Sequence, residues 1–115
     1  MKNISDEIMT ALIEYIALGL YKVNEKLPSV RELSTLYHVN PNTIAKVYAS
    51  LEEKGYIYAL PAKGYYVSET NPVLIDNVKL DMKPLIQKLI LLSKIIHLSQ
   101  SDLIDMLTKE DGKYD

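Results

Sequence analysis

Two helix starts that lie close together constrain this chain more than any other feature of its sequence. Ser29 is followed three residues later by Glu32, which is the spacing of a capping box, where two residues cap each other's backbone N–H groups. Asn40-Pro41 then supplies a second N-cap residue, with proline at the first helical position. The sequence therefore predicts a short helix, a tight turn and another helix in succession.

The apolar positions indicate how these two helices pack. Val39 lies between them as an apolar plug, and Gly55 is the expected end of the second helix. The buried face predicted for the second helix is Ile44, Val47, Tyr48 and Leu51, and that for the first is Val30, Leu33 and either Leu36 or Tyr37. This arrangement is typical of a helix-turn-helix, and an ordinary helical hairpin is the alternative.

The flanking segments extend the prediction to a complete domain. Apolar residues four apart predict an amphipathic helix over residues 4–20, with Ser5 as N-cap and Gly19 as its stop; the apolar positions are Ile8, Leu12, Ile16 and Leu20. Residues 56–60 and 65–67 read as two strands joined by a turn at 61–64. A hairpin directly after the third helix predicts a mainly α (α+β) winged helix-turn-helix over residues 1–70.

Residues 71–115 are predicted to form a C-terminal α-helical dimerisation segment. Residues 82–97 have a strongly helical pattern, Ser99 and Asp102 form a second capping box, and residues 112–115 are expected to be a frayed tail. Pro84 leaves the path of residues 73–83 open between a kinked helix and a loop.

The helix over residues 82–97 has an apolar surface too wide for one small domain to cover. We therefore expect a homodimer that uses Leu85, Leu89, Leu91, Leu92, Ile95 and Ile96. The alternative is a core within one chain, in which the last helix covers this surface with Leu103, Met106 and Leu107.

Composition excludes several kinds of chemistry. The chain contains no cysteine, so disulfides, Fe–S clusters, cysteine-based zinc sites and thiol nucleophiles are excluded. Its two histidines, His38 and His97, lack partners at the spacing of a catalytic triad or a metal site. No glycine-rich phosphate loop is present. We therefore expect neither an enzyme, nor a cofactor, nor a metal site.

Charge and hydropathy are less informative. The formal net charge is −2, so an interaction with nucleic acid has to rest on where the cations lie. The N-terminal residues turn acidic at once and do not resemble a secretory signal. The most apolar window, residues 85–98, is shorter than the roughly 20 residues that a membrane span needs. These features predict a cytoplasmic protein without membrane contact.

The outer face predicted for the second helix of the pair suits the major groove of DNA. That face is Asn42, Ala45, Lys46 and Ala49, with Thr43 and Ser50 at its margin. Alanines allow close approach, an asparagine can bond an adenine edge, and a lysine can reach guanine or phosphate. In the alternative interpretation, Asn42 and Thr43 only complete the first turn of the helix. The cations expected near this face are Lys22, Lys26, Arg31 and Lys63.

These residues, taken in order, resemble the GntR family of bacterial transcription regulators. The resemblance covers residues 8–67 and rests on four runs of sequence: LPSVREL (27–33), VNPNTIAKVY (39–48), LEEKGYI (51–57) and KGYYV (63–67). The Asn-Pro-Asn-Thr variant and the short tail are similar to the YtrA subfamily. Larger members carry an effector domain for which the roughly 45 residues after the linker leave too little chain.

The resemblance implies roles for individual residues. It implies that Arg31 contacts DNA, together with the start of the recognition helix at Asn40, Pro41, Asn42 and Thr43. It also implies that Lys46 is near a basic contact position, that Lys63 and Gly64 enter the minor groove, and that Ser29 is mainly a helix cap that can touch phosphate. The chain has fewer cations than many members, so we expect modest affinity and a shallow salt dependence. Tyr65 and Tyr66, where Thr-Phe is commoner, are expected to pack the wing.

Together these expectations describe a dimeric repressor that binds an inverted-repeat operator in double-stranded DNA. Lys22, Arg31 and Lys63 would hold the backbone or minor groove, and the resemblance suggests a transporter-linked operon. A winged helix used as a protein-interaction module is one alternative, favoured by the near-neutral charge. The other is a regulator controlled by an unknown small-molecule effector, bound at the dimer seam or at the junction near Tyr15, Tyr21 and Tyr48.

Overall fold

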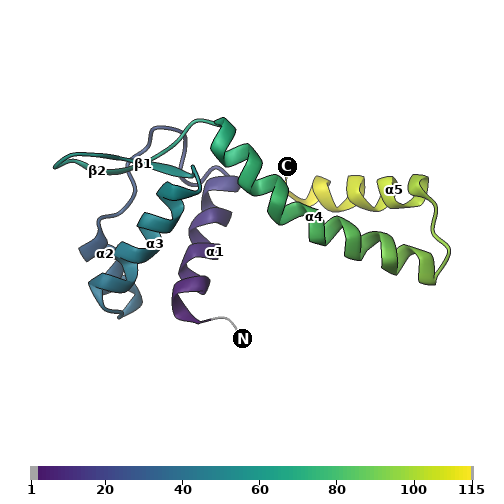
Figure 1. The fold of residues 1–115 in the computed structure, drawn as a ribbon, viewed down its shortest axis with the longest axis horizontal. Coiled ribbons are helices and arrows are strands. Elements are labelled where there is room, and N and C mark those ends of the chain that lie inside the picture. The colour runs from purple at the N-terminus through teal and green to yellow at the C-terminus, as the bar shows by residue number, and fades with distance from the viewer. Residues whose placement is uncertain (1–2, 115) are drawn as a thin grey trace. The chain divides into compact units, whose positions relative to one another are not determined.

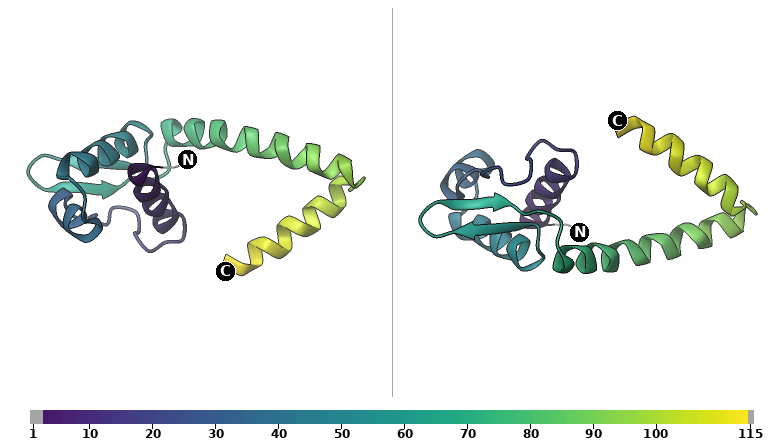
Figure 2. Two further views of the ribbon diagram at one scale, coloured as in Figure 1. Left: turned by 90° about the horizontal axis from the view of Figure 1, so that it is seen from below. Right: turned by 90° about the horizontal axis from the view of Figure 1, so that it is seen from above.

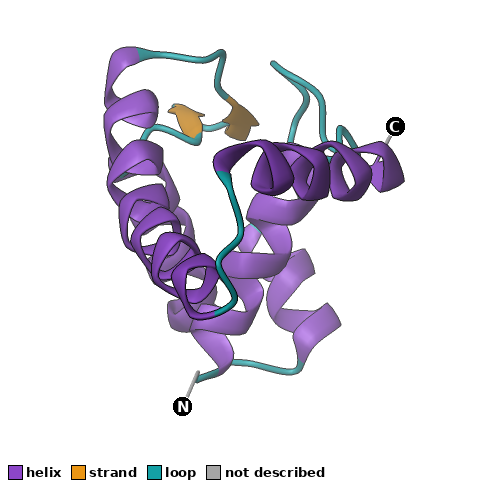
Figure 3. Cartoon of the chain, turned by 90° about the vertical axis from the view of Figure 1, so that its right-hand side faces the viewer, coloured by secondary structure: helices purple, strands orange, loops and turns teal. Residues whose placement is uncertain are grey.

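The computed structural model describes residues 3–114 and contains two compact units, the first ending at Asn77 and the second beginning at Val78. Figure 1 shows the elements in order: α1 (Ile4–Ala17), α2 (Val30–Tyr37), α3 (Pro41–Glu53), β1 (Ile57–Leu60), β2 (Gly64–Val67), α4 (Pro72–Ile95), α5 (Gln100–Asp111) and a 3₁₀ turn (Gly112–Tyr114). Helix dominates, and the strands described are confined to one hairpin (Figure 3). The predicted fold class is confirmed.

Both predicted starts of the helix pair are confirmed by their hydrogen bonds. The hydroxyl of Ser29 accepts the Glu32 N–H at 3.0 Å, and the Glu32 carboxylate accepts the Ser29 N–H at 3.1 Å. The Asn40 side chain accepts the Asn42 N–H at 2.8 Å, and Pro41 is the first residue of α3. Because these bonds join residues only two or three positions apart, the local sequence is enough to specify them.

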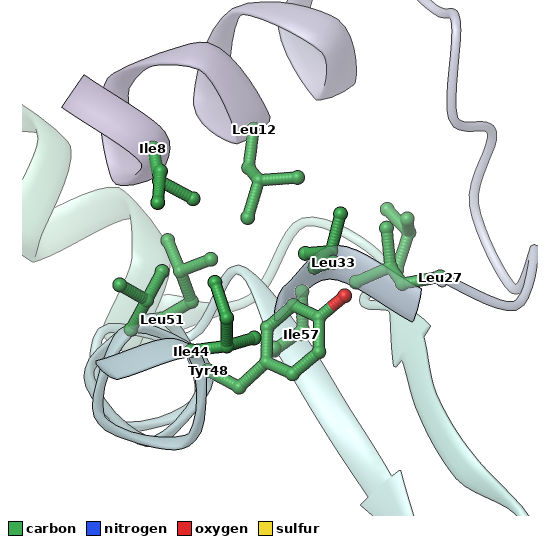
Figure 4. Close-up of a cluster of buried hydrophobic side chains, with 10 residues drawn as sticks. Ile8, Leu12, Leu27, Leu33, Ile44, Tyr48, Leu51 and Ile57 are labelled. Atoms are coloured by element: carbon green, nitrogen blue, oxygen red, sulfur yellow. The ribbon is translucent and has the colours of Figure 1, made fainter. Parts of the chain in front are cut away.

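A single apolar core holds α1, α2, α3 and the hairpin together (Figure 4). Its buried members are Ile8, Leu12, Leu27, Leu33, Ile44, Val47, Tyr48, Leu51, Ile57 and Val67. The Tyr48 hydroxyl is satisfied inside this core because it donates to the carbonyl oxygen of Pro28. The four residues predicted for the inner face of α3 are all buried, so the opposite face of the helix is left to solvent.

The hairpin packs one face on this core. Ile57 pairs with Val67 at its base and Leu60 with Gly64 near its tip. The first strand starts one residue later than predicted and the second starts one residue earlier. Tyr65 packs against Tyr48, with 4.8 Å between the ring centroids. Tyr66 and Tyr58 stack on the opposite face at 5.6 Å. The two tyrosines of β2 therefore serve different faces because side chains alternate along a strand.

Two details of the first two helices differ from the prediction, and a third decides between two alternatives that the sequence left open. The N-cap of α1 is Asn3 rather than Ser5, because the Asn3 side chain accepts the Asp6 N–H at 2.9 Å. Leu20 lies beyond the end of α1 and is 63% exposed. In α2, Tyr37 is half-buried while Leu36 is 68% exposed, which decides between the two alternatives.

The C-terminal helices also resolve open questions. α4 runs through residues 73–83 without interruption and contains Pro84, so the loop alternative is wrong. The helix ends at Ile95 rather than 97, and His97 adopts a left-handed conformation, with φ 58°, at the turn into α5.

The second capping box is confirmed, because the Ser99 hydroxyl accepts the Asp102 N–H at 3.1 Å. Residues 112–114 form a 3₁₀ turn instead of a frayed tail, and the expectation for Asp115 lies outside the described residues. None of the helices in 3–114 is long and apolar enough to cross a membrane.

Candidate nucleic-acid interface

The outer face of α3 is the centre of the candidate interface. Asn42, Ala45, Lys46 and Ala49 are all exposed, and Thr43 and Ser50 are half-buried at the margin, as predicted. Within residues 3–114, the side chains of Asn42 and Lys46 have no hydrogen bond or ion pair to another residue. Their amide and ammonium groups are therefore free to bind a ligand, with small alanine side chains between them.

The start of α3 divides its polar groups between the fold and the solvent. The carbonyl of the Asn40 side chain is already bonded to the Asn42 N–H, which leaves the Asn40 amide NH₂ as its free donor. The Thr43 N–H donates to the Asn40 backbone carbonyl at 2.9 Å. Asn40 is thus first a helix cap, whereas the exposed Asn42 side chain offers both a donor and an acceptor.

The start of α2 places Arg31 at the surface beside its cap. Arg31 is exposed, and it has no ion pair with any residue of the described range 3–114. The Ser29 hydroxyl is engaged by Glu32, and the hydrogen bond from the Ser29 backbone N–H is the main reason that the Glu32 pKa is lowered. The Glu32 carboxylate lies in the same helical turn but is bonded to Ser29 and not to Arg31. The Arg31 guanidinium is therefore available for binding an anion.

The wing ends in a short loop that carries Lys63. The Lys63 N–H donates to the Leu60 carbonyl at 3.0 Å, which closes the turn. Ala62 has φ 63° and Gly64 has φ 118°, so two residues of the turn use positive φ. Lys63 is exposed at the tip, and the hairpin extends past α2 and α3 in Figure 2.

Lys22 lies at the other end of the wing. Its backbone N–H donates to the Glu25 carboxylate at 3.2 Å, and Asn24, two residues on, pairs with Val67 at the base of β2. The Lys22 side chain is exposed but has a carboxylate close to its backbone. Lys22 therefore lies beyond the base of the wing, whereas Lys63 lies at its tip.

The exposed groups of this surface are suited to binding a base edge or a phosphate. No group of three or more metal-ligating side chains is found in the part of the chain that the structure describes. In the same part of the chain, every buried side-chain nitrogen and oxygen has a hydrogen-bond partner. What remains is a set of exposed donors and cations on α2, α3 and the wing.

The junction proposed for an effector is aromatic: Tyr48 is buried, Tyr21 is half-buried and Tyr15 is 37% exposed. The rings of Tyr15 and Tyr21 meet edge to face at 6.0 Å. Burial raises the pKa of both Tyr21 and Tyr37, and the Tyr48 hydroxyl is bonded to Pro28. Control by a small molecule at this junction stays a prediction.

The α4–α5 hairpin exposes most of the residues predicted for dimerisation. Figure 2 shows α4 and α5 diverging from their turn, and a hollow of about 150 Å³ lies between them, lined in part by Leu89. Leu89 and Leu103 are half-buried, whereas Met106 and Leu107 are exposed and give little cover. The remaining predicted residues are all exposed: Leu85, Leu91, Leu92, Ile95 and Ile96.

Sequence reasoning missed Asn71, which connects the end of α3 to the start of α4. Its side chain bonds both the Gly55 carbonyl and the Leu74 N–H. The signal was present, because Asn71-Pro72 repeats the Asn40-Pro41 helix start.

Comparisons with known proteins agree with this geometry. Residues 4–67 match the gntR family of bacterial regulatory proteins. The chain is 39% identical over 79 residues to the HTH-type transcriptional repressor YtrA of Bacillus subtilis, a match that covers 69% of this chain and 61% of that protein. In two longer regulators the matched segment spans only 14% and 13% of their length.

Solved structures show the same fold. A GntR family transcriptional regulator from Listeria monocytogenes has a TM-score of 0.70 and 31% identity, and the match covers 94% of this chain and 95% of that one. AraR(DBD), solved in complex with operator ORR3, has a TM-score of 0.57 and 24% identity over 59% of this chain and 82% of its own. The family match spans more than half of the sequence and agrees with the winged helix-turn-helix fold. This chain belongs to the GntR family of bacterial regulatory proteins.

Proposed function

We propose that this protein is a DNA-binding transcription regulator, and specifically a dimeric repressor that acts at an inverted-repeat operator. The observation that carries the proposal is the outer face of α3, where the side chains of Asn42 and Lys46 have no hydrogen bond or ion pair to any described residue and two alanines lie exposed beside them. The similar protein YtrA of Bacillus subtilis is a repressor, and AraR(DBD) was solved with its operator. Both relatives favour the same activity here.

Base reading is assigned to the first half of α3. The Asn42 side chain can donate from its NH₂ group to adenine N7 and accept from adenine N6–H₂ with its carbonyl oxygen, which is the two-bond pairing with adenine. Lys46, one turn later on the same face, can donate to guanine O6 or N7. The exposed Ala45 and Ala49 side chains add little bulk, so the helix can lie deep in the major groove.

Backbone contacts are assigned to the groups around α3. Arg31 at the start of α2 suits a phosphate because its guanidinium offers several donors, and Lys63 at the wing tip suits a phosphate or the minor groove. Five residues complete this surface as helix caps, residues of the first helical turn or wing-tip residues: Ser29, Asn40, Pro41, Thr43 and Gly64. Lys22 remains a prediction as a peripheral contact.

Dimerisation is assigned to the apolar surface of the α4–α5 hairpin. An unpartnered apolar surface of this kind is costly in water, and a second copy of the same hairpin is the simplest cover for it. Two copies related by a two-fold axis would read two half-sites in opposite orientation, so the operator would be an inverted repeat.

Selection of binding sites from a random pool of duplex DNA tests this proposal. The full chain would be used at about 100 mM salt, which weakens non-specific contacts. Enrichment of an inverted repeat is expected, since it requires both sequence-specific reading and two copies. Enrichment of a single half-site would overturn the dimeric part alone. Failure to enrich any motif, with binding that disappears in salt, would favour the protein-interaction alternative.

A further inference from the structure

We propose that Lys26 is a second cation of the wing, and that it binds a DNA phosphate beside Lys63. This inference rests on the proposed function, because it adds a residue to the same DNA interface. It concerns the segment between α1 and α2, which the sequence alone marks only as a loop with lysines.

That segment runs along the free edge of β2 and makes an isolated β-bridge to it. Lys26 and Tyr66 make an antiparallel bridge, and Tyr66 pairs with Tyr58 on its other side. Three backbone hydrogen bonds hold the segment in place: from the Asn24 N–H to the Val67 carbonyl at 2.8 Å, from the Val67 N–H to the Glu25 carbonyl at 3.1 Å, and from the Leu27 N–H to the Tyr65 carbonyl at 2.9 Å. The position of Lys26 along the wing is therefore fixed by the backbone.

The register places Lys26 on the outward face of the wing. Directly paired residues share a face of a sheet, so Lys26 lies with Tyr66 and Tyr58, which stack on each other. Tyr65, the next residue along β2, turns the other way and packs on Tyr48 in the core. The Lys26 side chain is accordingly exposed instead of being folded into the domain.

The side chain of Lys26 reaches toward the tip across a glycine. A Cβ atom placed on Gly64 would lie 3.2 Å from Cε of Lys26 and 4.0 Å from its Nζ. A side chain at position 64 would crowd the aliphatic part of the Lys26 side chain, and glycine leaves this space open. Because Gly64 directly follows Lys63, the Lys26 ammonium group lies beside the wing tip.

The charge of Lys26 is available to a ligand. It forms no ion pair with any of residues 3–114. The Lys26 charge interacts electrostatically with the Glu32 carboxylate. The lowered pKa of Glu32 is due first to its hydrogen bonds with Ser29, however, and Lys26 contributes least. Lys22, in contrast, lies beyond the base of the wing, before Asn24 in the paired segment.

Lys63 at the tip and Lys26 next to Gly64 give this end of the wing two exposed cations, which favours binding of an anion. Lysine binds phosphate as a point charge, without the fixed geometry that would read a base. Any duplex that meets Lys63 and Gly64 brings its backbone, with about one charge per 1.7 Å of helix axis, next to Lys26. We therefore expect Lys26 to raise affinity for all DNA sequences about equally.

The test compares Lys26→Gln, Lys26→Arg and Lys109→Gln with the unchanged protein, on the selected operator and on a scrambled duplex, over a range of salt concentrations. Lys26→Gln is expected to weaken binding to both duplexes about tenfold. The slope of log K against log salt should become shallower by about 0.9 for each bound copy. Lys26→Arg should keep the slope, and Lys109→Gln, on exposed α5, should change nothing.

The outcomes separate this inference from the function on which it rests. If the unchanged protein binds the operator and Lys26→Gln keeps its salt slope, Lys26 makes no phosphate contact and only this inference falls. A loss confined to the operator would make Lys26 a base-reading residue and would also overturn it. If the unchanged protein fails to discriminate the operator from the scrambled duplex, the proposed function falls as well.

Discussion

The side-chain amide of Asn71 donates a hydrogen bond of 3.0 Å to the backbone carbonyl of Gly55. The carbonyl oxygen of the same side chain accepts the Leu74 N–H at 3.0 Å in the first turn of α4. One residue therefore caps α4 and bonds its start to Gly55, just beyond the end of α3. Asn77 adds a second link, with 3.4 Å between its amide nitrogen and the Lys54 carbonyl.

Substitution of Gly55 by alanine tests how tightly this connection is packed. Gly55 has φ 89°, and a Cβ atom there would lie 2.8 Å from the Leu74 nitrogen and 2.9 Å from the Asn71 side-chain oxygen. We expect Gly55→Ala to lower the free energy of unfolding by about 2 kcal/mol or more, from both backbone strain and the clash. Chemical denaturation measures this loss.

Two other glycines provide matched controls for that measurement. Gly19 has φ 78° but has nothing within 4 Å of an added Cβ, so Gly19→Ala should cost only the strain, about 1 kcal/mol. Gly112 is in the right-handed helical region with open space, so alanine there should cost nothing. Equal losses at Gly55 and Gly19 would mean that the close approach to Leu74 is unimportant.

Substitutions of Asn71 separate the bonds of its amide, to the Gly55 and Glu69 carbonyls, from the bond of its oxygen to the Leu74 N–H. Asn71→Ala removes all three and should cost about 1–2 kcal/mol of unfolding free energy. Asn71→Ser restores an oxygen that can accept the Leu74 N–H, but it lacks the amide that donates to Gly55. We expect serine to recover part of the loss. The recovered part measures the cap on α4, and the part that serine does not recover measures the bonds of the amide, including the link to Gly55. Full recovery by serine would assign the whole effect to the cap.

The stability of the protein at alkaline pH should depend on Tyr48. Burial, and then the nearby Tyr21 and Glu32 groups, raise the pKa of Tyr48 above its ordinary value near 10. Below pH 10 both the folded and unfolded states hold the proton, so this contribution to stability is complete. Above pH 10 the unfolded state loses the proton first, and stability falls by up to about 1.4 kcal/mol per pH unit.

Tyr48→Phe provides the comparison. It removes the hydroxyl that donates to Pro28, so it should cost about 1 kcal/mol at pH 7. Between pH 10 and 11 its stability should fall less steeply than that of the unchanged protein, because the raised pKa of Tyr48 no longer contributes, whereas the raised pKa values of Tyr21 and Tyr37 still do. Parallel curves of unfolding free energy against pH would show that Tyr48 titrates alike in both states.

The sequence predicted the elements whose signals are local and missed the features that depend on distant residues. The boxes at Ser29 and Ser99 and the cap at Asn40 bond within three residues, so their spacing alone defines them. For α1, Asn3 and Ser5 are both capping residues two positions apart, and the sequence does not rank them. Asn3 caps in the structure, and the Ser5 hydroxyl donates to it at 2.7 Å.

Tertiary contacts decided the remaining cases. Leu36 and Tyr37 are adjacent on α2, and which of them turns inward depends on the packing of α1 and the wing. Pro84 removes one backbone donor, but the rest of α4 continues through it, so proline did not end the helix. The outer face of α3 was predicted correctly because its inner residues repeat with helical spacing, whereas the position of Lys26 follows from a strand pairing that no local pattern indicates.

Substitution of the assigned DNA contacts should separate base reading from backbone binding. Lys46→Ala should weaken binding to the selected operator by about 1–3 kcal/mol and reduce its advantage over other sequences. Arg31→Ala should weaken binding to all sequences and make the salt slope shallower by about 1. Both side chains are exposed, so melting temperatures should not change. Lys88→Ala on α4 is the control, and intact affinity in both variants would remove these assignments.

Lysine substitutions on α4 test the dimer surface. Leu85 is 68% exposed and Leu92 is 52% exposed in the single chain, so a double change to lysine removes little packing within it. The unchanged protein is expected to have twice the chain mass of 13.1 kDa in light scattering, and the double variant to have that mass once. Because a dimer binds two half-sites at once, operator affinity should fall by at least about a hundredfold. A double variant that keeps the dimer mass would place the interface elsewhere, since two buried lysine charges would not be tolerated in an apolar contact.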